Sequence, residues 1–251
     1  MILDEIIRRT EKRVADLPAT FSNTANVTHV SLEDAIHTAS KKNAIIAEIK
    51  CASPSRGVIR RNVDILMMAG VFVDHGCVAL SVLTEPYFFG GAQNDIAKVK
   101  SAVSVPVLRK DFIIDKRQIA ETRALGADAV LLIAAVLGDQ LPDFVDVAYE
   151  SGLEPLVEVR TEEDVGYALA TRARLIGINN RDLTTLSIDR SATRRLSGPI
   201  RAAGRTVISE SGTQSADDIR EMRPFCDAFL VGSAIMSDRK PGRKLEELVC
   251  A

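Results

Sequence analysis

The first residues that could do chemistry are two charges inside an apolar run, in the stretch AEIKCASPS at positions 47 to 55. Glu48 and Lys50 are two residues apart, so in a strand their side chains lie on the same face. A strand buried in a structural core would carry apolar residues at both positions. A carboxylate and an ammonium on one surface can instead serve as a base and an acid, and we take this pair as the first candidate for catalysis.

Further polar residues occupy the same kind of position, at the end of an apolar run. Lys110 ends VPVLRK, Glu158 lies near the end of LEPLVEV, and Asn179 ends RLIGIN. Arg181 follows two positions later and shares a face with Asn179. If these runs are parallel strands of one sheet, their carboxyl ends meet at one edge and the polar side chains converge there.

The elements that must position these residues are short β-branched or aliphatic runs, separated by segments with helical periodicity. Near-continuous apolar runs are typical of parallel strands covered on both faces. Eight such strand and helix units in 251 residues predict the α/β class and a single closed (β/α)8 TIM barrel. An open doubly wound sheet is the alternative, but the chain lacks a Gly-x-Gly-x-x-Gly turn after its first strand. The predicted strands are residues 44–50, 77–83, 105–110, 128–133, 153–159, 174–179, 205–209 and 227–232.

The residues before the first strand predict two extra helices, at about 2–15 and 31–40, with Ser31 and Asp34 resembling a cap at the start of the second. We expect this extension to cover the barrel or its mouth. No linker or low-complexity stretch divides the chain. We therefore predict one domain over 1–251, with a helical extension at 1–40 and the barrel at 44–251.

Two turns of small residues follow the last two predicted strands: SESG at 209–212 and VGSA at 231–234. Loops after strands seven and eight commonly form the phosphate site of such barrels, because backbone N–H groups favour an anion. Either turn alone is ordinary turn composition. Together they predict a phosphate site at Gly212, Gly232 and Ser233.

Composition narrows the other classes of function. A net charge of −2 argues against a broad nucleic-acid surface, and no apolar stretch approaches the ~18 residues of a membrane span. The first residues are unlike a secretory signal, so we expect a cytoplasmic protein. Neither the four cysteines nor the three histidines have the spacing of metal ligands, so we expect reduced thiols and no metal site.

These residues lie in stretches that resemble the indole-3-glycerol phosphate synthase family of tryptophan biosynthesis. The resemblance implies a carbon–carbon lyase without metal or organic cofactor. It converts 1-(2-carboxyphenylamino)-1-deoxyribulose 5-phosphate to indole-3-glycerol phosphate, releasing carbon dioxide and water. One departure is SAIM at 233–236, where many members have Glu or Thr after the glycine. The matching stretches, from about residue 44 to 236, are AEIKCASPSRG, SVLTEPYFFGG, PVLRKDFIID, GADAVLLIAA, LVEV, GINNRDLTTL, SESG and LVG.

The resemblance also implies roles for single residues. Lys110 matches the family's general acid on the C2′ oxygen of the substrate. We expect Lys50 and Glu48 to act as an acid and base pair in the dehydration, with Glu158 orienting or assisting, and we place Asn179 in the same catalytic group. The substrate-binding residues predicted are Ser53, Phe112, Leu131, Arg181, Glu210 and Ser211.

Two features extend this prediction. Phe89 and Leu183 are further candidates for an apolar wall, and the loop from Ser53 to Gly57 is predicted to be a mobile flap over the substrate. The predicted partner is a phosphorylated anthranilate derivative, and a neighbouring pathway enzyme stays open as a second partner. Two rival functions remain: a Schiff-base aldolase that uses Lys110 or Lys50 as nucleophile, and a barrel that serves only as a scaffold.

Overall fold

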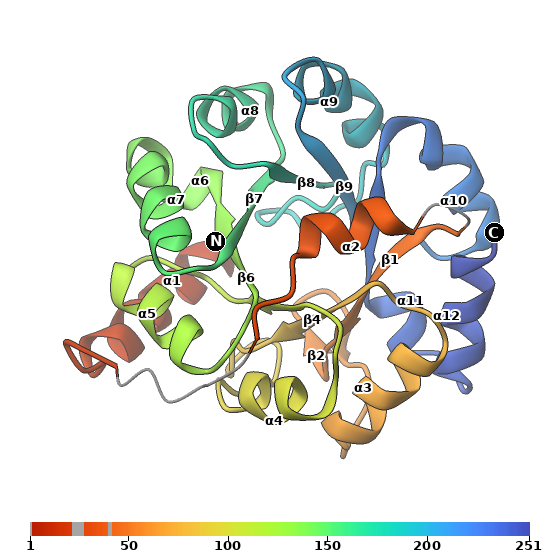
Figure 1. The fold of residues 1–251 in the computed structure, drawn as a ribbon, viewed down its shortest axis with the longest axis horizontal. Coiled ribbons are helices and arrows are strands. Elements are labelled where there is room, and N and C mark those ends of the chain that lie inside the picture. The colour runs from red at the N-terminus through yellow and green to blue at the C-terminus, as the bar shows by residue number, and fades with distance from the viewer. Residues whose placement is uncertain (1, 22–27, 40–41) are drawn as a thin grey trace.

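The computed structural model describes residues 2–21, 28–39 and 42–251, and its centre is a closed barrel of eight parallel strands (Figure 1). The barrel closes because the first strand pairs on both sides, with Ala47 in register with Leu80 and with Val231. The predicted TIM barrel is thus confirmed and the open sheet is wrong. The strands are β1 Ala44–Ile49, β4 Ala79–Leu83, β5 Val107–Lys110, β6 Ala129–Ile133, β7 Glu154–Val159, β8 Leu175–Asn179, β9 Thr206–Glu210 and β10 Ala228–Val231.

One strand boundary differs from the prediction in a way that matters for the site. The run predicted to end at Ser209 continues through Glu210, which pairs in register with Asn179 and Leu230. Glu210 therefore belongs to a barrel strand and not to the turn after it. Its side chain is 1% exposed.

Alternation along the strands produces two apolar cores. Side chains that point inward, such as Ile46, Leu108 and Leu156, fill the barrel, and those that point outward, such as Ile45 and Val107, pack under the helices. The inner core ends where charged side chains begin, at the carboxyl ends of the strands. That boundary forms the floor of a site.

Helices follow the strands and enclose the barrel. Several begin at a side-chain cap that binds free N–H groups of the first turn, as Asp115 does for α5 and Thr161 for α8. A short hairpin, β2 Ala52–Ser53 with β3 Gly57–Val58, follows β1. The helices are α1 Ile2–Ala15, α2 Leu32–Thr38, α3 Ile65–Asp74, α4 Asp95–Ala102, α5 Lys116–Ala124, α6 Ala134–Leu137, α7 Leu141–Glu150, α8 Glu162–Leu169, α9 Ser191–Ala202, α10 Ala216–Met222, α11 Ser233–Met236 and α12 Pro241–Val249, with 3-10 turns η1 Gly138–Gln140 and η2 Arg223–Phe225.

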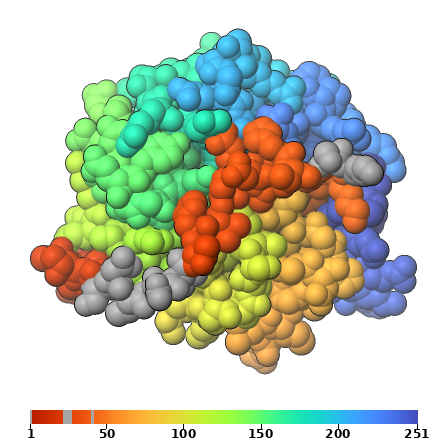
Figure 2. Space-filling model, in the orientation of Figure 1, coloured from red at the N-terminus to blue at the C-terminus, as the bar shows by residue number. Residues whose placement is uncertain are grey.

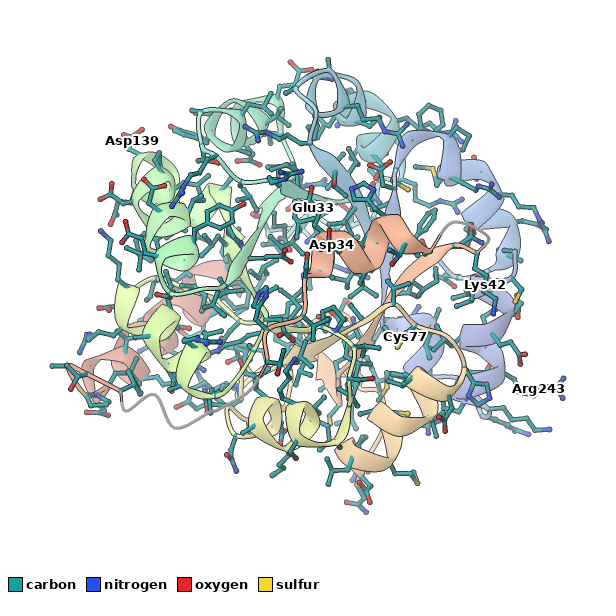
Figure 3. All side chains as sticks on the ribbon, in the orientation of Figure 1. Glu33, Asp34, Lys42, Cys77, Asp139 and Arg243 are labelled. Atoms are coloured by element: carbon teal, nitrogen blue, oxygen red, sulfur yellow. The ribbon has the colours of Figure 1, made fainter. Side chains whose placement is uncertain are left out.

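The two predicted extra helices are present, and they cover opposite ends of the barrel. Helix α2 crosses the amino-terminal end of the strands, where Figure 2 shows its orange residues over the middle of that face. The carboxylate of Glu154, the first residue of β7, accepts hydrogen bonds from the Ser31 hydroxyl at 2.7 Å and the Leu32 N–H at 2.5 Å. Figure 3 shows Glu33 and Asp34 in the same first turn.

The cap predicted at this start is confirmed, because the Ser31 side chain accepts from the Asp34 N–H. The helix ends at Thr38, before the predicted residue 40, which lies outside the described residues. Helix α1 instead lies at the opposite end, where Ile2 and Ile6 line the mouth of the barrel. That the chain forms one domain, with the boundaries given above, stays a prediction.

Three expectations from composition can be compared with the structure. All four cysteines are free thiols, as predicted. Among the described residues, no helix is long and apolar enough to cross a membrane. In the same residues, no group of three or more His, Cys, Asp and Glu side chains could hold a metal ion.

Candidate active site

The carboxyl ends of the strands surround a cavity of about 1140 Å³, counted out to its open mouth. Charged side chains form the floor of this cavity, and apolar side chains form one wall. The turns after β9 and β10 form part of its rim. All but one of the predicted site residues line this cavity, and Asn179 lines an adjoining pocket that shares Glu158 and Arg181 with it. The predicted residues on the cavity are Glu48, Lys50, Ser53, Lys110, Phe112, Leu131, Glu158, Arg181, Glu210, Ser211, Gly212, Gly232 and Ser233.

Lys110, at the end of β5, lies between two carboxylates from other strands. Its Nζ is 2.6 Å from Glu210 Oε2 and 3.1 Å from Glu158 Oε2. Burial alone would lower the pKa of Lys110, but the negative charges of Glu210, Glu158 and Glu48 outweigh it, so the pKa is raised. The side chain is therefore an ammonium at neutral pH and can donate a proton or a strong hydrogen bond.

Glu48 and Lys50 form the ion pair that their spacing predicts, with Lys50 Nζ 2.5 Å from Glu48 Oε1. Glu48 is 3% exposed, and it fits because a glycine directly follows the neighbouring strand β10. A Cβ at Gly232 would lie 2.4 Å from Glu48 Oε1. Gly232 is thus required by the carboxylate packed on it, in addition to any contact with a ligand.

Asn179 and Arg181 project from the end of β8. The Asn179 amide donates to Glu158 Oε1 at 3.0 Å, which leaves the other oxygen of Glu158 to Lys110. Burial lowers the pKa of Arg181, and the nearby guanidinium of Arg56 lowers it further. Two cations that repel each other across a cavity favour an anion between them. Arg56 lies within the predicted flap but was not among the site residues predicted from the sequence.

The apolar wall includes the four candidates that the sequence suggested. Phe89 and Phe112 lie with ring centroids 6.3 Å apart, and Leu131 and Leu183 line the same cavity. Three residues of α1 complete the wall, and none of them was predicted from the sequence. The apolar stripe of the helix was visible in the sequence, but nothing showed which surface it covers. They are Ile2, Leu3 and Ile6.

The two small-residue turns reach the cavity from β9 and β10. Ser211 and Gly212 both have positive φ, 64° and 93°, so the chain turns sharply after Glu210. A Cβ at Gly212 would also lie 3.0 Å from Arg190 Cγ, so its left-handed conformation and its surroundings both require glycine. Gly232 and Ser233 follow β10 and lead into α11. The turns therefore lie where the sequence predicted a phosphate.

The segment predicted to be a flap is the hairpin β2–β3. Ser53 is 7% exposed and lines the cavity, whereas Gly57 at the tip is exposed and has a φ of 62°. That the hairpin opens and closes over a substrate stays a prediction.

The pKa of Glu210 gives a test of how these charges are coupled. Burial raises this pKa from 4.5 to about 7, the Lys110 ammonium opposes the rise, and Glu158 adds to it. A carboxyl with a higher pKa in the folded state favours folding below its unfolded pKa and loses that contribution as the pH rises through about 7. We therefore expect the free energy of unfolding of the parent to fall between about pH 5 and pH 8 by ~2–3 kcal/mol more than that of Glu210→Gln.

Urea unfolding at several pH values measures this difference. Glu11→Gln, which removes an exposed glutamate on α1 far from this cluster, is the control variant. If Glu210→Gln shows the same pH dependence as the parent, Glu210 does not titrate in this range.

A closed (β/α)8 barrel, with acid and base residues and paired Ser-Gly turns at its strand ends, defines the class of TIM-barrel enzymes that act on small phosphorylated substrates. Comparison with known proteins narrows this class. The family model described as indole-3-glycerol phosphate synthase matches residues 3–248, and the chain belongs to this family. The resemblance predicted from sequence is thus confirmed.

Individual relatives agree with the family. An indole-3-glycerol phosphate synthase of Bordetella pertussis is 47% identical over 210 residues, covering 83% of this chain and 80% of the relative. One from Caldanaerobacter subterraneus subsp. tengcongensis is 42% identical over 240 residues, covering 94% and 93%. The solved structure of tryptophan synthase from M. tuberculosis has a TM-score of 0.65 at 14% identity, over 89% of this chain and 98% of that chain. This last likeness concerns the fold alone.

Proposed function

We propose that this cavity catalyses the reaction of its family, by general acid and base catalysis from the residues at its floor. The protein is a decarboxylating carbon–carbon lyase of tryptophan biosynthesis. It converts 1-(2-carboxyphenylamino)-1-deoxyribulose 5-phosphate to indole-3-glycerol phosphate. The observation that carries the assignment of roles is Lys110, a partly buried ammonium held by two carboxylates in a cavity with an apolar wall.

Ring closure forms a bond between the ring carbon that bears the carboxylate and C2′ of the sugar chain. The C2′ carbonyl oxygen gains negative charge in this step. Lys110 gives that oxygen a proton or a strong hydrogen bond, and Glu158 and Glu210 keep its ammonium oriented. The apolar wall with Phe112 and Leu131 holds the aromatic ring of the substrate.

Decarboxylation and dehydration follow. The C–C bond between the carboxylate and the ring breaks, carbon dioxide leaves, and the electron pair of that bond stays with the ring and restores part of the conjugation. Loss of the C2′ hydroxyl as water then requires an acid at that oxygen and a base for the departing proton. Lys50 and Glu48 supply this pair, 2.5 Å apart, while Glu158 orients or assists and Asn179 fixes Glu158.

Arg181 and the two turns bind the charged ends of the substrate. The guanidinium of Arg181 can hold a carboxylate or hydroxyl in a fixed geometry, and Ser53 and Arg56 line the same cavity. The phosphate lies on the backbone of Ser211, Gly212, Gly232 and Ser233.

The phosphate assignment makes a prediction. Inorganic phosphate or sulfate should bind at Gly212, Gly232 and Ser233 and should compete with the substrate, because both would use the same N–H groups. Steady-state inhibition and crystals soaked in either anion test this. Purely non-competitive inhibition, or an anion bound only elsewhere, would contradict the assignment.

The charge of Lys110 argues against the alternative function, an aldolase that forms a Schiff base at this lysine. A nucleophilic lysine needs a lowered pKa, whereas that of Lys110 is raised. Borohydride added with substrate should therefore leave the protein mass unchanged. A trapped adduct on Lys110 or Lys50 would revive the aldolase.

Turnover itself is tested directly. The carboxyphenylamino-deoxyribulose phosphate is added to the purified chain, and indole absorbance is followed together with release of carbon dioxide. An inactive chain that still folds would contradict the proposed reaction and leave the two rival functions, the aldolase and the scaffold. A cytoplasmic location, an absence of nucleic-acid binding and a pathway-enzyme partner stay predictions, based on composition and on the proposed reaction.

A further inference from the structure

Asn180 lies between two residues of the site but is not itself directed at the cavity. Its neighbours Asn179 and Arg181 line the pocket beside Glu158. Asn180 is 1% exposed and packs behind the ends of β8 and β9. A buried carboxamide in this position must be satisfied by the protein.

The hydrogen bonds of Asn180 account for both ends of its side chain. Oδ1 accepts from the N–H and the hydroxyl of Thr193, at 3.2 and 2.9 Å. Nδ2 donates to the carbonyl oxygens of Glu210 at 3.0 Å and Ser211 at 3.1 Å, and to Ser209 Oγ at 3.2 Å. The carboxamide is therefore fully used within the protein, and Asn180 can act on a ligand only through the residues that it holds.

Those residues are the peptide groups of the turn after β9. In a planar trans peptide the C=O and the following N–H point in opposite directions, and the described peptides include no cis bond. Since Asn180 binds the carbonyl oxygens of Glu210 and Ser211 on the protein side, the N–H groups of Ser211 and Gly212 are turned the other way. Both residues line the cavity.

The turn needs such support because of its backbone conformation. Ser211 has a φ of 64°, a left-handed conformation that is unfavourable for a residue with a Cβ and persists only where its surroundings hold it. The Asn180 amide binds the carbonyl of this same residue. The strained peptide is thus held by a contact on the side away from the cavity.

We propose that Asn180 is the positioning residue of the phosphate site: it fixes the turn so that two successive N–H groups face the anion. This inference rests on the proposed function, which places the substrate phosphate on the turn. It predicts that loss of the Asn180 amide donor weakens phosphate binding selectively. The apolar wall, and Lys110 with Glu158, lie on other elements of the barrel and should be unaffected.

The test compares Asn180→Asp and Asn180→Ser with the parent, using inorganic phosphate and anthranilate as separate probes on the full chain. Asp has the same shape but no N–H, and Ser cannot reach both carbonyls. In both variants the inhibition constant for phosphate and the KM should rise at least ~10-fold, because two or more buried hydrogen bonds to the turn are lost. The anthranilate affinity should stay within ~2-fold and kcat should fall less than ~3-fold.

Thr193→Val is the matched control. This variant removes the Thr193 hydroxyl, which is hydrogen-bonded to Asn180 Oδ1 and to Ser209 Oγ. Asn180 Nδ2, at the other end of the carboxamide, keeps its contacts with the turn. This variant should lose stability with an unchanged inhibition constant for phosphate. A merely structural role of Asn180 would instead give the same result in Thr193→Val as in the Asn180 variants.

Each outcome decides the question. If the parent itself does not bind phosphate, the proposed phosphate site fails. If the parent binds it and the folded Asn180 variants bind it equally well, only the inference about Asn180 fails. Failure of both variants to fold, with Thr193→Val folded, would also overturn it, because Asn180 would then serve stability alone.

Discussion

Lys110→Ala should lower kcat by at least ~100-fold while substrate binding weakens far less. The ammonium contacts an oxygen whose negative charge grows during ring closure, so its interaction is stronger in the transition state than in the ground state. Its loss should therefore appear in the chemical step. Lys110→Arg should not restore the rate, because a guanidinium is a poor proton donor near neutral pH and its planar fork has a different reach.

Because Lys110 lies between two carboxylates, this experiment needs a check of folding and a control at another lysine. Removing the ammonium leaves Glu158 and Glu210 close together without a cation, so folding must be verified by circular dichroism before rates are compared. Lys116→Ala removes an exposed lysine at the start of α5 and should keep the parent rate. A folded Lys110→Ala protein within a factor of a few of the parent rate would show that Lys110 is not the acid and would transfer the role to Lys50.

The barrel and the position of its site could be predicted from the sequence because both depend on periodicity. Apolar runs at regular intervals indicate parallel strands, and the carboxyl ends of parallel strands must lie together. Glu48, Lys110 and Glu158 are far apart in the chain, and the topology alone brings them to one floor. The resemblance added roles, but convergence at the strand ends was expected without it.

What the sequence could not predict depends on partners that no local pattern specifies. Glu210 was assigned to a turn because SESG has turn composition, yet it is the last residue of β9 and its charge is balanced by Lys110, a hundred residues away. The Glu210 carboxylate fits because β8 carries Gly177, where a Cβ would lie 2.0 Å from Glu210 Oε1. Contacts of this kind require the closed barrel.

The stretch Arg109-Lys110-Asp111 shows the same limit most sharply. Three successive charges suggest a solvated segment, but alternation places Lys110 in the cavity and Arg109 on the outer face of β5, with Asp111 directly after the strand. Arg109 and Asp111 are 0% and 1% exposed. Asp111 accepts hydrogen bonds from Thr84 at 2.7 Å, from Arg109 at 3.1 Å and from Arg13 of α1 at 2.9 Å.

Asp111→Ala should destabilise the protein by ~3–5 kcal/mol, because it leaves the buried guanidinium of Arg109 without one of its two carboxylates. Urea unfolding measures the loss. The exposed pair of Arg172 and Asp146 provides the control, since Asp146→Ala should cost less than ~1 kcal/mol. If the unpaired charge is the cause, adding Arg109→Met to Asp111→Ala should recover part of the loss. Two results would contradict this explanation: a loss below ~1 kcal/mol in Asp111→Ala, or a double variant that is less stable than Asp111→Ala. Either would mean that the buried charges of Arg109 and Asp111 do not stabilise β5.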